Sequence, residues 1–142
     1  MNIENITLSV LSALCLLLNG YIYYTYLLAV KSTSWPQSMA NIDFCEVQYH
    51  ATNSWTNNSW TIKFYYTYVV DFVTYQSKRY YFGAPIIGIN SKEMLAVEEK
   101  FKAKEKIEIY YNPVKPSVST VKSGVNSLLL IAMIASFFLL LF

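Results

Sequence analysis

The hydrophobic pattern of the chain is continuous at both ends and alternating in the middle. Residues 6–30 and residues 125–142 form two apolar runs that contain no charged side chain. A helix needs about 20 such residues to cross the roughly 30 Å hydrocarbon core of a bilayer. At about 1.5 Å per residue the second run has just enough length for one crossing. The pattern therefore predicts two transmembrane helices, one at each end of the chain.

Each apolar run also has an alternative interpretation. The first resembles a signal peptide in its position, but a signal peptide has a basic start and a short core that ends in small residues. Residues 1–5 contain no Lys or Arg, and no such cleavage site follows. The second run is alternatively a buried core helix. Residues 31–124 are too few to cover two helices that are apolar on all sides, so we favour two membrane spans.

Small and weakly polar residues interrupt both apolar runs. Ser12 and Asn19 are seven residues apart and so lie on nearly the same helical face, next to Gly20. Such residues let helices approach closely in lipid. We therefore expect Ser12, Asn19, Gly20 and Ser136 to form a contact between helices, within one chain or in a homo-oligomer. The alternative is that these residues are tolerated without any contact.

Between the two runs, apolar and polar positions alternate as they do in β-strands. This pattern predicts strands at residues 42–49, 60–74, 79–82 and 106–111, with a hairpin turn near 74–78. A helix is expected at residues 91–104, after an N-cap at Asn90 with Glu93 three residues later. Residues 32–40 read as a linker. The predicted fold is a compact, mainly antiparallel, small-barrel-like β domain (residues 31–124) with one short helix, between N-terminal residues 1–30 and C-terminal residues 125–142.

Alternation also predicts which side chains are buried. Along the longest strand, one face carries five large apolar side chains: Phe64, Tyr66, Tyr68, Val70 and Phe72. On the helix and the last strand, the side chains expected to face the core are Met94, Val97, Phe101, Ile107, Ile109 and Tyr111. Side chains two apart in a strand share a face, so these sets predict one continuous core.

Composition narrows the classes of function. Apolar residues make up 54% and charged residues 14% of the chain, against about 45–50% and 25% in soluble domains. A net charge of +2 gives no basic stripe of the kind that nucleic-acid binding requires. Cys15 and Cys45 lie in different predicted parts, so we expect no disulfide.

Catalytic and metal-binding patterns are missing from the sequence. His50 is the single histidine, whereas a structural metal site takes about four ligands. The sequence has no Cys-x-x-Cys, no Gly-rich phosphate loop and no Gly-x-Ser-x-Gly. We therefore expect no enzyme, no metal and no cofactor.

Two surfaces are candidates for recognition. Trp35, Trp55 and Trp60 are expected to contact a partner or lipid, and the loop at residues 51–60 is the best candidate for a contact surface. Lysines near the predicted helix form either a basic surface for anionic lipid or a partner, or a solvated face with a Glu98–Lys102 pair. We favour the solvated face.

The segment before the second apolar run resembles a known family. Tyr110, Tyr111, Asn112, Pro113 and Pro116 follow its hydrophobic-Tyr-Tyr-Asn-Pro-x-x-Pro pattern, and Trp35-Pro36 resembles the Trp-Pro after its first span. Residues 66–75 and 79–83 resemble its next strands. The family comprises bacterial two-span membrane proteins with a domain of unknown function. The resemblance implies a fold and a membrane setting, but no activity and no catalytic residue.

Charge and family together suggest a location and a role. All 11 Lys and Arg lie between the apolar runs, and basic flanks tend to stay cytoplasmic. We expect a multi-pass protein of the bacterial inner membrane with its β domain in the cytoplasm, a periplasmic domain being the alternative. The expected function is non-catalytic binding of a protein partner, as an accessory or assembly subunit. The alternative is an immunity protein that protects the inner membrane against a bacterial toxin.

Overall fold

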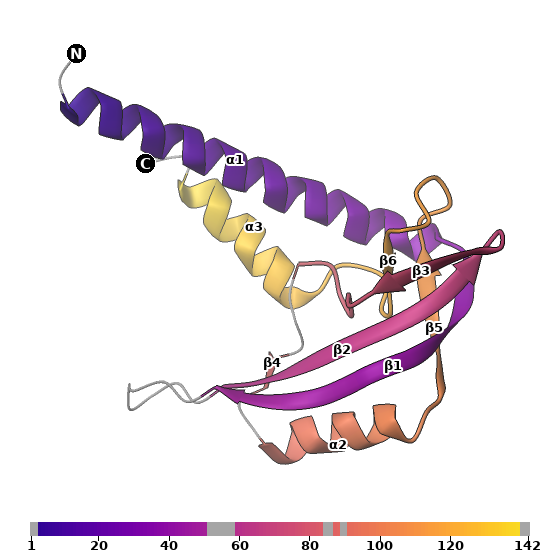
Figure 1. Ribbon diagram of the computed structural model, residues 1–142. Coiled ribbons are helices and arrows are strands. Elements are labelled where there is room, and N and C mark those ends of the chain that lie inside the picture. Colours follow the sequence, from indigo (N-terminus) through magenta and orange to yellow (C-terminus); the bar gives the residue numbers. More distant parts are fainter. Residues whose placement is uncertain (1–2, 51–58, 84–86, 89–90, 140–142) are drawn as a thin grey trace.

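A computed structural model describes residues 3–50, 59–83, 87–88 and 91–139 (Figure 1). Its helices are α1 (Ile3–Lys31), the short 3₁₀ helix η1 (Ser32–Ser34), α2 (Ser91–Lys102) and α3 (Ser127–Leu139). Its strands are β1 (Gln37–His50), β2 (Ser59–Val70), β3 (Val73–Ser77), β4 (Ile87–Gly88), β5 (Lys106–Tyr111) and β6 (Ser119–Thr120).

All six strands belong to one antiparallel sheet. The order is β3-β2-β1-β5-β6, and β4 also pairs with β2. A bulge in β1 between Ile42 and Phe44 shifts the register, so that Cys45 lies opposite Phe64. A bulge adds one residue to a strand and re-aims the side chains that follow. Asp43, the residue without a partner in register, instead accepts hydrogen bonds from the side chains of Thr67 and Gln76.

The core lies on one face of the curled sheet. Four of the five side chains predicted along β2 are buried there: Phe64, Tyr66, Tyr68 and Val70. Helix α2 covers this face with Met94 and Phe101, as its pattern predicts. Beyond β3 and β6, the Val121 N–H donates to the Arg79 carbonyl (3.2 Å) and the Lys122 N–H to the Tyr80 carbonyl (2.9 Å). These bonds draw the two sides of the sheet together.

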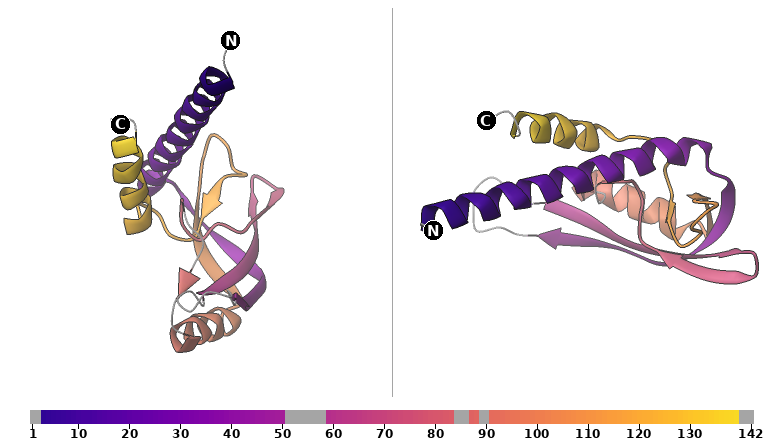
Figure 2. Two further views of the ribbon diagram at one scale, coloured as in Figure 1. Left: turned by 90° about the vertical axis from the view of Figure 1, so that its left-hand side faces the viewer. Right: turned by 90° about the horizontal axis from the view of Figure 1, so that it is seen from above.

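Helix α3 lies beside α1, outside the sheet, in both views (Figures 1 and 2). Ala29, Trp35, Phe82 and Leu129 form a second apolar cluster at the point where these helices meet the β domain. We call these four residues the junction cluster. Its Trp35 and Phe82 rings meet edge to face at 5.6 Å, a favourable arrangement of two aromatic rings.

Three polar contacts fix the junction. Ser32, directly after α1, accepts a hydrogen bond from the Gly124 N–H at 2.9 Å. Asn126 accepts one from the Leu129 N–H at 2.7 Å and donates one to the Phe82 carbonyl at 3.3 Å. Asn126 therefore caps α3 and ties its start to the β domain.

Helix α1 is long and apolar enough to cross a bilayer. The stretch Ser9–Ser34 has 26 residues, of which little is buried, although an N-terminal signal sequence would share these properties. Within the described residues, the apolar stretch of α3 is shorter, Ser127–Phe137. At 1.5 Å per residue the 13 residues of α3 reach only about 20 Å. The second span therefore stays a prediction.

The hairpin after β2 is where the structure differs most from the predicted strands. Its turn lies at Asp71 and Phe72 rather than at residues 74–78, and Val73–Ser77 returns along β2 as β3. Phe72, predicted to face the core, is fully exposed. The reason is the backbone: φ is 51° at Asp71 and 63° at Phe72. Two-residue turns of this kind usually contain Asn or Gly, and Phe gives no such signal.

Other helix and strand boundaries also differ from the predicted ones. Strand β1 begins at Gln37, inside the predicted linker. Residues 79–82 are not a strand, although the carbonyl groups of Arg79 and Tyr80 accept hydrogen bonds from the backbone of residues 121–122. Helix α2 ends at Lys102, two residues before the predicted end. The predicted N-cap, Asn90, lies outside the described residues.

Candidate interaction surfaces

The polar side chains buried in the core are partnered. Tyr66 lies against Ser119 (2.9 Å between the hydroxyl oxygens) and also donates to the Arg79 carbonyl at 3.1 Å. Burial raises the pKa of Tyr66. Within the described residues no buried side-chain nitrogen or oxygen lacks a hydrogen-bond partner. This network is what a stable polar core requires.

Potential metal ligands and nucleophiles are scattered. No group of three His, Cys, Asp or Glu side chains able to hold a metal occurs among the described residues. Both cysteines are free; Cys15 is half-buried on α1 and Cys45 is buried in the sheet. Burial raises the pKa of the Cys45 thiol, which disfavours the reactive thiolate.

The three tryptophans differ in position. Trp35 is buried in the junction cluster, where its ring packs edge to face against Phe82, and its contact with a partner or lipid stays a prediction. Trp60 is half-buried near the free end of β2 and packs on the exposed Tyr49, with ring centroids 4.6 Å apart. Trp55 lies outside the described residues.

The segment with the Tyr-Tyr-Asn-Pro-x-x-Pro pattern forms the loop between β5 and β6. Asn112 accepts hydrogen bonds from the Val114 N–H (2.9 Å) and the Lys115 N–H (3.3 Å). The hydroxyl of Tyr68, from β2, donates to the Pro116 carbonyl. An Asn that bonds the backbone two residues ahead stabilises a turn, so this motif shapes the loop.

The two tyrosines of the motif pair β5 with the start of β1. The Tyr110 hydroxyl accepts a hydrogen bond from Gln37 (3.0 Å), and the Tyr111 N–H donates to the Pro36 carbonyl (3.1 Å). Pro113 is exposed at the loop.

The small polar residues of the apolar helices bond within their own helices. Ser12, Asn19 and Ser136 each donate to a carbonyl three or four residues earlier. A methyl group added at Gly20 would meet nothing within 4 Å. Gly20 is therefore not packed within the chain, and contact between chains stays a prediction.

An exposed apolar tip forms the β2–β3 turn. Phe72 is fully exposed there, with exposed Val69 and Val73 beside it, and Val114 is exposed on the β5–β6 loop. The turn lies at the end of the molecule farthest from the N-terminus (Figures 1 and 2). We call Val69, Phe72 and Val73 the hairpin tip.

A basic groove of about 710 Å³ runs between α2, β5 and the segment that follows β6. Six apolar or aromatic side chains line it: Met39, Tyr80, Val97, Phe101, Ile107 and Val121. Its charged lining is four lysines and one acid: Lys100, Lys104, Lys106, Lys122 and Glu108. The groove is open to solvent along one side, and its lining is nearly evenly divided between polar and apolar surface.

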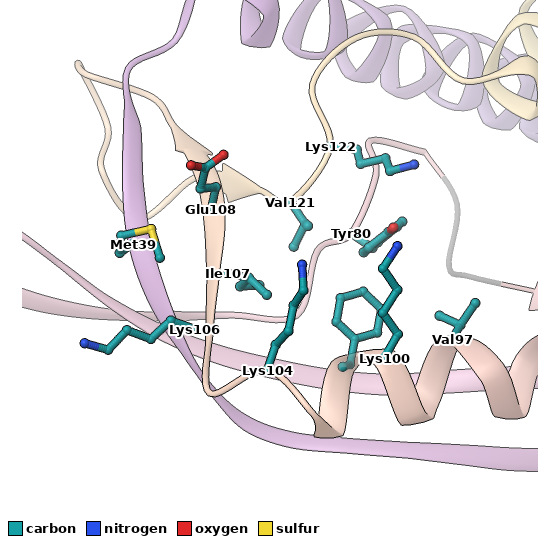
Figure 3. A pocket seen from close by; sticks show the side chains of 11 residues that line it. Met39, Tyr80, Val97, Lys100, Lys104, Lys106, Ile107, Glu108, Val121 and Lys122 are labelled. Atoms are coloured by element: carbon teal, nitrogen blue, oxygen red, sulfur yellow. The ribbon is translucent and has the colours of Figure 1, made fainter.

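The lysines of the groove point in different directions (Figure 3). Lys100 on α2 and Lys104 just after it reach toward the wall that holds Tyr80 and Lys122, whereas Lys106 points away. The Lys122 ammonium lies 5.8 Å from the ring centroid of Tyr80 and 5.6 Å from that of Tyr81, distances at which a cation and an aromatic ring attract.

Lys102, unlike the nearby Lys100 and Lys104, has an acidic partner. It forms an ion pair with Glu98 at 2.8 Å, which confirms the predicted pair, and hydrogen bonding to Lys102 lowers the pKa of Glu98. Among the described residues, Lys100, Lys104 and Lys122 form no such ion pair. The positive charges of Lys100, Lys104 and Lys122 are therefore not neutralised there by a carboxylate.

Comparison with known proteins gives one match. A family model described as a domain of unknown function, DUF3592, matches residues 40–126, more than half of the 142 residues. The chain belongs to the DUF3592 family. No curated protein and no solved structure matches it.

The DUF3592 match covers the β domain. It begins in β1 and ends at Asn126, the residue that caps α3. It includes the hairpin tip and the groove lining other than Met39. Helix α1 and Trp35 lie before it, so the match comprises most of the sheet, α2 and the motif loop.

Sequence reasoning missed the hairpin tip of this DUF3592 domain and left the basic surface as the less favoured alternative. Phe72 was predicted to be core, because alternation continues through it without a Gly or Asn to mark the turn. Lys100 and Lys104 were interpreted as a solvated face. Their convergence with Lys122 depends on the contact of residues 79–80 with 121–122, which no local pattern reveals.

Proposed function

We propose that this chain is an integral membrane protein whose β domain binds a protein partner without catalysis. The observation that carries the proposal is an uncovered apolar surface at each end of the molecule. One end is the N-terminal half of α1, and the other is the hairpin tip.

The apolar helix supports the membrane half of the proposal. Six large apolar side chains of α1 are more than half exposed: Val10, Leu11, Leu14, Leu16, Leu17 and Leu18. Ile131, Ile134 and Phe137 are exposed on the neighbouring α3. Contiguous apolar surface of this extent is rare on soluble monomers. Lipid is the cover that such helices fit, with Tyr21, Tyr23 and Tyr24 suited to the interface.

The hairpin tip supports the proposed binding of a protein partner. A fully exposed Phe in a left-handed backbone conformation costs stability by strain and gains none of the stability that burial of its ring would give. Such costs are typical of binding sites, where the strained residue meets a partner. The tip lies far from the exposed half of α1 (Figure 1), so a protein suits it better than the same bilayer.

Affinity purification of the tagged full chain in mild detergent tests the binding half. Wild type, Phe72→Ala and Leu95→Ala are compared by quantitative mass spectrometry in the native host. Leu95 is the matched control, because it is an exposed apolar residue on α2. A partner should copurify with wild type and Leu95→Ala and fall at least about tenfold with Phe72→Ala, as expected for a buried aromatic anchor.

The outcomes separate the possible roles. Recovery of membrane subunits indicates an accessory or assembly role, and recovery of a toxin indicates an immunity protein. Equal recovery of every protein with all three chains would contradict a binding role for the hairpin tip.

A further inference from the structure

We infer that the basic groove binds the phosphate headgroup of an anionic phospholipid from the bilayer that holds the chain. This inference rests on the membrane half of the proposed function. It concerns a different surface from the hairpin tip.

The charges of the groove fit a phosphate. Lys100 and Lys104 enter from α2 and Lys122 stands on the opposite wall (Figure 3). Ammonium groups around a phosphate form charge-assisted hydrogen bonds. Glu108, the one acid of the lining, lies farther along β5 on the side of Val121, apart from the Lys100 and Lys104 side chains (Figure 3).

The apolar lining fits the remainder of a lipid. Val97, Phe101, Ile107 and Val121 are apolar and line the same space as the lysines. A free inorganic anion would leave these apolar side chains exposed to water, whereas the glycerol and upper acyl carbons of a phospholipid would cover them. The groove therefore matches an anionic amphiphile better than a small anion.

The position of the groove places it near the lipid. Lys122 precedes α3 by only five residues, and Figure 3 shows its segment running directly into that helix. Gly124, in the same segment, is bonded to Ser32 at the end of α1. If the helices cross the bilayer, the Lys122 wall of the groove lies beside their exit, where clustered lysines attract anionic lipids.

Native mass spectrometry of the full chain in neutral detergent tests this inference. Phosphatidylglycerol and phosphatidylcholine are added as competing probes. The wild type should retain phosphatidylglycerol, and Lys100→Gln with Lys104→Gln should weaken that binding about tenfold. Lys63→Gln with Lys78→Gln removes the same charge outside the groove and should leave the binding unchanged.

Several results would overturn the inference. These are equal retention of the two lipids, equal loss in the control, displacement of phosphatidylglycerol by millimolar inorganic phosphate, or tighter binding of a polyglutamate peptide. Lys122→Gln offers a second variant should the first pair alter thermal unfolding. Carbonate extraction of the same membranes keeps the two proposals apart: release of the chain refutes the membrane half, whereas a retained chain without lipid preference refutes only the groove.

Discussion

At the scale of single residues, the strained turn at Asp71 and Phe72 is the most unusual feature of the sheet. Both residues adopt positive φ values, a conformation that costs a residue with a Cβ about 1–2 kcal/mol. Burial of the Phe72 ring does not offset this cost, because the ring is fully exposed. The proposed partner contact would account for this strain, because the described residues offer Phe72 no burial that offsets it.

Replacing Phe72 with Gly should therefore stabilise the protein. Gly adopts positive φ freely, and its greater freedom in the unfolded state offsets part of the gain. We expect the free energy of unfolding to rise by about 0.5–1 kcal/mol, measured by thermal unfolding of the full chain in detergent. Phe72→Ala keeps the strain and should change stability little. A less stable Phe72→Gly would show that the ring makes a stabilising contact.

At Gly83, in contrast to Phe72, the positive φ is occupied by a glycine, and the junction leaves no room for a side chain. Its φ is +92°, and a Cβ there would lie 2.9 Å from the Leu129 Cδ1 atom on α3. Gly83→Ala should lower the free energy of unfolding by about 2 kcal/mol, since it adds both strain and a clash. Gly20→Ala is the control, because its methyl group meets nothing within 4 Å and Ala favours a helix. Equal effects of the two substitutions would refute this close approach.

At the scale of elements, the buried tyrosines of the sheet make its stability depend on pH. Burial raises the pKa of Tyr66, Tyr68 and Tyr80 above the ordinary value, which is about 10 for a free side chain. A group with a raised pKa binds its proton more tightly in the folded state. Its contribution is complete below pH 10 and is lost as the pH rises above that value.

Thermal unfolding between pH 8 and pH 11 should show this loss. The melting temperature should begin to fall above about pH 9, where the Cys45 thiol ionises in the unfolded chain, and should fall more steeply above about pH 10. Tyr66→Phe should lower stability by about 1 kcal/mol at pH 8, through the hydrogen bonds to Ser119 and Arg79, and make the alkaline fall shallower. Tyr65→Phe, on the other face of β2, is the control. A flat profile to pH 11 would contradict the prediction.

Much of the element pattern could be predicted from the sequence, and its failures have physical reasons. The buried face of β2 and the core positions of α2 follow from local alternation, so Phe64, Tyr66 and Phe101 were predicted correctly. The bulge at Asp43 and the turn at Phe72 could not be predicted, because neither carries Gly, Pro or Asn. The groove depends on residues distant in sequence, such as Lys104 and Lys122, which only the folded sheet brings together.

At the scale of the whole molecule, the basic residues near the helix ends bear on which compartment holds the β domain. Lys31 lies in the last turn of α1, and Lys115 and Lys122 precede α3. Basic residues near the ends of spans favour the cytoplasmic side. We therefore propose that both helix termini away from the domain face outward and that the domain faces the cytoplasm.

Cysteine labelling tests this orientation. Lys63 is exposed on β2, so Lys63→Cys in a chain with Cys15→Ala and Cys45→Ala offers a single reactive thiol. A membrane-impermeant maleimide should label it only after spheroplasts are permeabilised. Labelling of intact spheroplasts would show a periplasmic domain instead.

The bond between Ser32 and Gly124 has a mechanical consequence. It joins the end of one apolar helix to the approach of the other, and the junction cluster fills the space between them and the sheet. An apolar helix that is too long for a thin bilayer accommodates by tilting. If α1 spans a membrane and this joint stays closed, the β domain would swing as one body with the helix, and bilayer thickness would set the angle at which the domain meets its surroundings.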